Sequence, residues 1–135
     1  MWTYRQCDGW LLDPSGLKLA QGYSGAGAGK NSVDAQAIED VGPIPQGLYK
    51  IEPPVNTVTH GPAVLPLNPL PNNQMYGRSG FLIHGDSVVA PGTASMGCIV
   101  IARFARDRIA QSGDVTLKVV SGLPPVSDPS LGVDP

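Results

Sequence analysis

The sequence predicts an α+β domain that is mainly β, built as a curved mixed sheet or a β-sandwich with one helix. Its 17 glycines and 14 prolines, against only 15% charged residues, indicate many short elements joined by tight turns. Apolar residues make up 41%, enough for one core at this length. Helical spacing is clear only in residues 101–112, where Ile101, Ala105 and Ile109 recur every four residues.

The amino-terminal third of the sequence predicts strands and a glycine-rich loop. Residues 2–24 are expected to form a β-hairpin around Asp13-Pro14-Ser15-Gly16, with Cys7 in its first strand and in the core. Residues 22–32 are a glycine-rich loop, and a short helix is expected over 33–38.

The rest of the chain alternates apolar runs with turns. Strands are predicted over 48–51, 63–67, 81–83, 98–101 and 115–120. Gly113 is expected to end the helix, and its arginines (Arg103, Arg106 and Arg108) to form a solvated face. Residues 1–121 are therefore predicted to be one domain, followed by a poorly ordered tail over 122–135.

Charge and composition exclude several classes of partner. The net charge of −2 offers no basic surplus for nucleic acid, and no run approaches the roughly 20 apolar residues that insertion in a membrane requires. No basic n-region leads into an apolar stretch, so no Sec signal is expected. Two cysteines and two histidines support neither a disulfide framework nor a metal site, and we expect no cofactor.

The glycine-rich loop does not match a phosphate-binding loop. Ser24 stands where the first glycine of that motif is required, and Asn31 follows Gly29-Lys30 in place of Ser or Thr. A nucleotide-binding function is therefore not predicted.

The residues that suggest chemistry are His84 and, fourteen positions later, Cys98. An imidazole beside a thiol can serve as its base, and Gly97 lets a substrate carbonyl approach the backbone. The Gly97 and Cys98 N–H groups are then candidate oxyanion donors. The alternative is a thiol packed in the core, because free cysteines are commonly buried.

Longer stretches around these residues resemble L,D-transpeptidase catalytic (YkuD-like) domains. The resembling segments are Phe81-Leu82-Ile83-His84-Gly85-Asp86, Ser95-Met96-Gly97-Cys98-Ile99, Gly77-Arg78-Ser79-Gly80 and Gly42 to Ile51. Met96 replaces the family's usual histidine and Val100 its usual arginine or asparagine. With these departures, and with Tyr23-Ser24-Gly25, the sequence is more similar to the L,D-transpeptidase-related toxin domain of type VI secretion effectors.

That resemblance implies a cysteine-dependent L,D-carboxypeptidase or transpeptidase acting on peptidoglycan stem tetrapeptides. Cys98 would attack the carbonyl between the diamino acid and the terminal D-Ala, and His84 would transfer the proton. It also implies an antibacterial effector with a secretion-system carrier and an immunity protein. Such an effector is made in the cytoplasm and acts in the periplasm after delivery by a secretion system or a phage.

Four further residues are candidates for the site. Asp86 would orient His84 or make a local Asx-turn, and Arg78 would bind a substrate carboxylate or lie on a surface turn. Ser95 would bond within the site or shape the turn, and Tyr23 would line the cleft rim. His60, with no cysteine at a useful spacing, is interpreted as structural.

Two other functions stay open. An NlpC-type cell-wall endopeptidase places its cysteine before its histidine, the reverse of the order found here. A non-catalytic β-rich phage or secretion-system module would leave Cys98 packed and unreactive.

Overall fold

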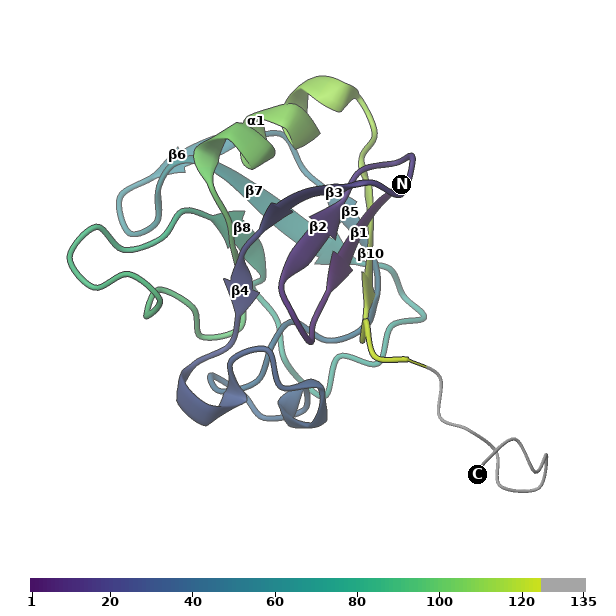
Figure 1. The fold of residues 1–135 in the computed structure, drawn as a ribbon, viewed down its shortest axis with the longest axis vertical. Coiled ribbons are helices and arrows are strands. Elements are labelled where there is room, and N and C mark those ends of the chain that lie inside the picture. Colours follow the sequence, from purple (N-terminus) through teal and green to yellow (C-terminus); the bar gives the residue numbers. More distant parts are fainter. Residues whose placement is uncertain (125–135) are drawn as a thin grey trace.

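The computed structural model describes residues 1–124, and within them one α-helix packs against a mixed sheet (Figure 1). The strands are β1 (Trp2–Arg5), β2 (Trp10–Leu12), β3 (Lys18–Gln21), β4 (Tyr23–Ser24), β5 (Gly47–Ile51), β6 (Val55–Thr57), β7 (Gly61–Pro69), β8 (Leu82–His84), β9 (Ile99–Val100) and β10 (Thr116–Val120). The helices are α1 (Arg103–Ser112) and two 3₁₀ turns, η1 (Gly27–Gly29) and η2 (Val33–Ala35). The predicted mainly β fold with one helix after the cysteine strand is confirmed. Of the predicted tail, residues 125–135 lie outside the described residues.

The sheet is curved, and its two ends are joined by a single residue. Its strand order is β3-β2-β1-β10-β5-β7-β8-β9-β4, with β6 paired to β7. Although β3 and β4 stand at opposite ends of this order, only Gly22 separates them in the chain, so the sheet must curl round. A Cβ on Gly22 would lie 1.9 Å from the carbonyl oxygen of Val100, which restricts this junction to glycine.

The amino-terminal hairpin is larger than predicted, because β1, β2 and β3 form a three-stranded antiparallel meander. The predicted turn joins β2 to β3, where the Asp13 carboxylate accepts the N–H groups of Ser15 and Leu17. The prediction that Cys7 lies in the first strand is wrong. Cys7 lies half-buried in the turn after β1, where its N–H donates to the carbonyl of Ser121.

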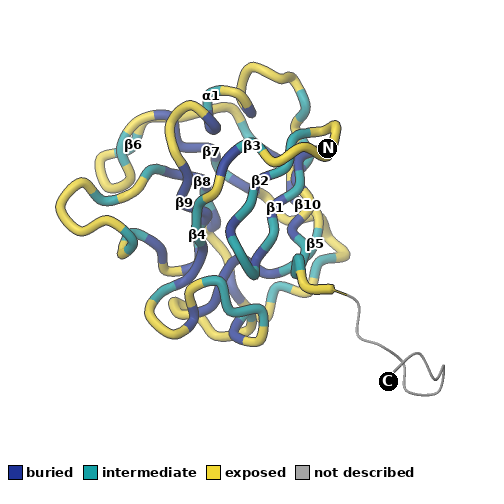
Figure 2. Tube along the Cα trace, in the orientation of Figure 1, coloured by how far each residue is buried: buried dark blue, intermediate teal, exposed yellow. Residues whose placement is uncertain are grey.

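The core is built by strands from both halves of the curled sheet together with α1, and Figure 2 shows the buried segments along the chain. Both halves of the sheet contribute buried side chains to it, among them Trp2, Tyr4, Leu11, Tyr49, Leu65, Ile83, Ile99 and Leu117. Helix α1, which packs on β7 and β8, adds Ala105 and Ile109. Gly113, with φ of 74°, ends α1 as predicted. No helix among residues 1–124 is long and apolar enough to span a bilayer.

One arginine of α1 contradicts the predicted solvated face. Arg103 and Arg108 are exposed, but Arg106 is only 6% exposed. Its guanidinium turns inward because it donates hydrogen bonds to backbone carbonyl oxygens. The acceptors are Ile101 and two residues at the start of β7, Pro62 and Ala63. These backbone partners could not be read from helical periodicity.

Four smaller differences concern the extent of the elements. The helix predicted over 33–38 is only the 3₁₀ turn η2, and the strand predicted over 63–67 extends to the full length of β7. The excursion after β5 contains the unpredicted strand β6. Tyr23, expected within the glycine-rich loop over 22–32, starts strand β4, which pairs with β9.

Candidate active site

The pairing of β8 with β9 brings the segment that carries Cys98 next to the strand that ends at His84. The two strands pair in parallel, with Ile83 opposite Ile99 and His84 opposite Val100. His84 ends β8, whereas Cys98 lies in a bend directly before β9, so the alternation of side chains along a strand does not extend to it.

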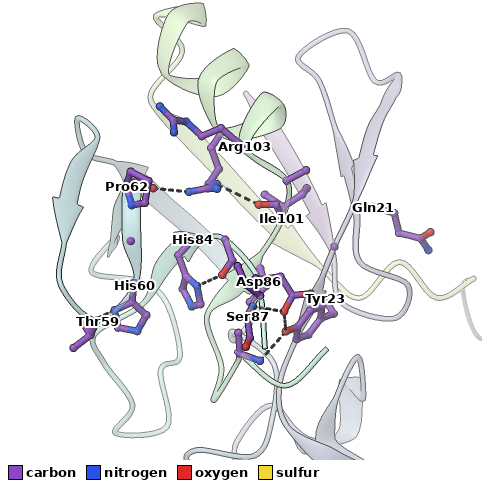
Figure 3. A pocket seen from close by; sticks show the side chains of 18 residues that line it. Gln21, Tyr23, Thr59, His60, Pro62, His84, Asp86, Ser87, Ile101 and Arg103 are labelled. Atoms are coloured by element: carbon purple, nitrogen blue, oxygen red, sulfur yellow. Dashed lines mark hydrogen bonds between the residues drawn. The ribbon is translucent and has the colours of Figure 1, made fainter. Parts of the chain in front are cut away.

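The two side chains nevertheless line different cavities. Cys98 lines a small cavity of about 130 Å³, where its Sγ lies 4.0 Å from the carbonyl oxygen of Gly80. His84 lines a larger cavity of about 790 Å³, drawn in Figure 3. Within the described residues no hydrogen bond joins Cys98 to the His84 ring. In this structure the two side chains therefore face separate cavities.

The backbone fixes the tautomer of His84. The ring is 2% exposed, and its Nδ1 lies 2.8 Å from the carbonyl oxygen of Gly85. A carbonyl only accepts, so Nδ1 carries the proton of the neutral ring and Nε2 keeps the basic lone pair. His84 therefore presents Nε2 as a proton acceptor.

Asp86 does not hold the orienting position predicted for it. Its carboxylate accepts the Tyr23 hydroxyl at 2.7 Å, the Ser87 N–H at 2.7 Å and the Gly92 N–H at 3.1 Å. These bonds organise the loop after β8 without forming the Asx-turn that was the alternative, because they come from Ser87 and Gly92 and not from the N–H two residues on, while the Gly85 carbonyl orients the ring. Figure 3 shows Tyr23, Asp86 and Ser87 joined beside His84.

Burial keeps the resting pair neutral. It raises the pKa of the Cys98 thiol, an effect opposed by a backbone hydrogen bond from Leu82 and by the positive charge of Arg78. Burial also lowers the pKa of His84, and the Gly85 hydrogen bond only partly offsets this. The thiolate expected from a resting Cys–His ion pair is therefore disfavoured.

Two serines shape the turn that carries the cysteine. The Ser95 hydroxyl donates to the Cys98 carbonyl at 2.6 Å and accepts the Gly97 N–H at 3.1 Å. The Ser24 hydroxyl, which the sequence did not single out, donates to the Gly97 carbonyl at 2.9 Å. Of the two predicted oxyanion donors, the Gly97 N–H is thus occupied. The Cys98 N–H has no protein acceptor within residues 1–124.

Replacing Gly97 with alanine is expected to lower the free energy of unfolding by at least about 2 kcal/mol. Gly97 has φ of 132°, and an added Cβ would lie 2.4 Å from Nη2 of Arg78. Urea unfolding measures the loss. Gly16→Ala is the control, because it has φ of 91° but nothing within 4 Å of the added Cβ. Equal losses in both variants would show that the contact with Arg78 is unimportant.

Arg78 lies in the interior and not on a surface turn. It is 6% exposed, and its guanidinium donates to the carbonyl oxygens of Gln36 at 2.6 Å, Pro43 at 2.8 Å and Gly42 at 3.0 Å. It also lies over the ring of Phe81, 5.1 Å from the centroid. Arg78 therefore ties the 36–43 segment to the wall of the Cys98 cavity, which its side chain also lines.

A family model described as the Tlde1 domain matches residues 18–121. The chain belongs to the Tlde1 domain family. Tlde1 domains are toxin-like domains of type VI secretion effectors, so the chain is an effector domain of that system. Delivery by a secretion system and a cognate immunity protein are what such an effector domain implies. Comparisons with curated proteins and with solved structures found no match.

Tyr23 of this Tlde1 domain lines the His84 cavity, and its hydroxyl bridges two parts of the following loop. It donates to Asp86 and accepts the Ala94 N–H at 2.8 Å, and burial raises the pKa of Tyr23 to about 12. The phenol is therefore neutral at physiological pH. Its bonds hold the loop against β4.

The structure of the Tlde1 domain adds two residues that sequence reasoning missed. The ring of His60, interpreted as structural, lies 4.6 Å from the His84 ring and lines the same cavity. Arg106 lines it as well. No pattern in the sequence indicated a role for His60, which lies on a turn far from His84 along the chain. The position of Arg106 next to the apolar Ala105 was only a weak indication that its side chain is buried. Within residues 1–124 no group of three or more His, Cys, Asp or Glu is arranged to hold a metal ion.

Proposed function

We propose that this Tlde1 domain is a cysteine-dependent L,D-carboxypeptidase or L,D-transpeptidase acting on peptidoglycan stem tetrapeptides, and that it functions as an antibacterial effector in the periplasm. The supporting observation is a buried histidine whose Nδ1 faces the Gly85 carbonyl, which leaves Nε2 as the base, at the end of the strand that pairs with the one directly after Cys98. Residues 1–121 are proposed to be the catalytic unit.

In the proposed reaction His84 Nε2 takes the Cys98 proton as the sulfur attacks the carbonyl between the diamino acid and D-Ala. The Cys98 N–H stabilises the oxyanion. The carbon–nitrogen bond then breaks, and His84 returns the proton to the departing amine. Water attacking the thioester gives hydrolysis, whereas an incoming amine gives exchange.

The approach of Cys98 to His84 belongs to the substrate-bound state. Hydrogen bonds between catalytic groups are often long in a free enzyme and shorten when substrate binds. Cys98 directly precedes the strand that already pairs with β8, so the approach requires no change in strand pairing. The carboxylates of Glu39 and Asp40 line the Cys98 cavity, where they suit the free ammonium group of a diamino acid.

Incubation with disaccharide-tetrapeptides, with and without D-Met, tests this function by mass spectrometry. Loss of the terminal D-Ala indicates hydrolysis, and its replacement by D-Met indicates exchange. Cys7→Ala is the matched control, because Cys7 lines neither cavity and should leave turnover unchanged. No product from a folded wild-type protein would overturn the proposal.

The pH profile of kcat/KM should have its acid limb below pH 6.5. Burial lowers the pKa of His84, and a protonated ring cannot accept the thiol proton, so activity is lost only as pH falls through that lowered value. Initial rates between about pH 4.5 and 9 measure the midpoint. A midpoint above 7 would contradict the role of His84 as buried base.

A non-catalytic binding module is the second candidate. The separate cavities of Cys98 and His84 and the raised pKa of Cys98 favour it. Slow alkylation of Cys98 at pH 7 is now expected in both cases, because burial keeps the thiol protonated. Alkylation in the presence of a tetrapeptide separates them, since only an enzyme should show substrate-dependent modification or an acyl-enzyme.

A further inference from the structure

Arg106 carries a buried positive charge whose free edge faces the His84 cavity. Nε donates to Ile101, and Nη1 to Pro62 at 2.8 Å and Ala63 at 3.1 Å. These bonds use three of the five N–H groups of the guanidinium. The two N–H groups of Nη2 have no acceptor within residues 1–124, and no carboxylate there forms a salt bridge with Arg106.

Nη2 lies beside the residue that follows His84. An ideal Cβ built on Gly85 would be 2.9 Å from it, so the absence of a side chain at Gly85 keeps this edge open. The carbonyl oxygens of Ile101 and Pro62, residues labelled in Figure 3, accept hydrogen bonds from the other two nitrogens of the guanidinium, Nε and Nη1. The donor pair is therefore fixed in direction before any ligand binds.

The cavity around it holds an arginine without a carboxylate partner. Two arginines line it, and Arg103 is salt-bridged to Asp107 at 3.0 Å, so Arg106 is the one whose charge is unpaired within the described residues. The cavity's only carboxylate within the described residues is Asp86, already bonded to Tyr23 and two backbone N–H groups. A buried guanidinium without a counter-ion is stabilised by a carboxylate that can accept its hydrogen bonds.

We propose that Nη2 of Arg106 binds the α-carboxylate of the amino acid released at His84, and of the free D-amino acid that replaces it in exchange. This inference rests on the proposed function. His84 gives a proton to the leaving amine, and in an α-amino acid the carboxylate carbon is two bonds from that nitrogen. A group that binds the carboxylate must then lie next to His84, where Nη2 is found.

The same site serves both directions of the exchange. In release, the sulfur–carbon bond forms, the amide bond breaks, and the thiol proton passes through His84 to the amine. In exchange, the incoming amine attacks the thioester, its proton passes through His84 to the departing sulfur, and an amide forms. Both amino acids place their carboxylate on Arg106.

Binding of D-Met and of D-methioninamide to the Cys98→Ala protein tests the inference without requiring turnover. NMR titration should show D-Met binding at least about tenfold more tightly than the amide, which lacks the carboxylate. Arg106→Gln should remove this preference, and Arg106→Lys should keep part of it. Arg108→Gln, the same charge change on the exposed side of α1, should leave it unchanged.

The outcomes separate this inference from the proposed function. Equal binding of acid and amide by the Cys98→Ala protein would overturn the Arg106 site, even if the wild type releases D-Ala from tetrapeptides. Selective binding of the acid without turnover by the wild type would support the site and count against the enzyme. The comparison of ligands needs no Arg106 variant, so misfolding of Arg106→Gln cannot hide the result.

Discussion

Cys98→Ala is expected to lower the rate of D-Ala release from a tetrapeptide by at least about 10⁴-fold, because no other group can form the acyl-enzyme. The effect should be on kcat, since removing one sulfur from the 130 Å³ cavity leaves its charged walls in place. The released product is measured by quantitative mass spectrometry. Long incubations at high enzyme concentration make a rate this low measurable.

Two comparisons make this result specific. Cys7→Ala removes the other thiol and should retain wild-type rates, whereas Cys98→Ser should be nearly as inactive as Cys98→Ala, because a serine hydroxyl is far less acidic than a thiol. Intact-protein mass spectrometry should detect an acyl adduct only where Cys98 is present. Residual activity above about a tenth in a folded Cys98→Ala protein would show that the reaction does not pass through this sulfur.

Arg78→Met should lower the free energy of unfolding by about 3 kcal/mol, roughly 1 kcal/mol for each hydrogen bond lost to a backbone carbonyl. The acceptors on Gln36, Gly42 and Pro43 would lose their donor inside the protein. The contact with Phe81 would lose its cationic character as well. Urea unfolding monitored by tryptophan fluorescence gives the change.

The matched variants for this prediction are Arg78→Lys and Arg108→Met. Lysine keeps the charge without the planar fork, so it should recover only part of the loss. Arg108 is exposed, and its replacement should change stability by less than about 0.5 kcal/mol. If Arg78→Met unfolds like the wild type but raises KM, then Arg78 is primarily a substrate-binding residue, as the sequence first suggested.

Local patterns were enough to predict most elements and the two central residues. Short apolar runs between turn residues predicted the strands that became β5, β8 and β10, and four-residue spacing with Gly113 predicted α1. These predictions succeeded because each depends on neighbours within a few positions. The same holds for His84, which ends β8 at the close of one apolar run, and for Cys98, which directly precedes β9 at the start of another.

Contacts between distant segments decided what surrounds that pair. The Gly85 carbonyl, and not Asp86, orients His84, and Ser95 occupies the Gly97 N–H that seemed free for an oxyanion. His60 comes to His84 on the turn before β7.

The sequence by itself therefore determined the mainly β class, the single helix and the candidate residues Cys98 and His84. Only the tertiary structure decided that Arg78 and Arg106 are buried, that the thiol rests protonated, and that the two residues line separate cavities. The physical reason is that burial, and with it the pKa of each group and the partners of each guanidinium, depends on segments that the fold brings together from far apart in the chain.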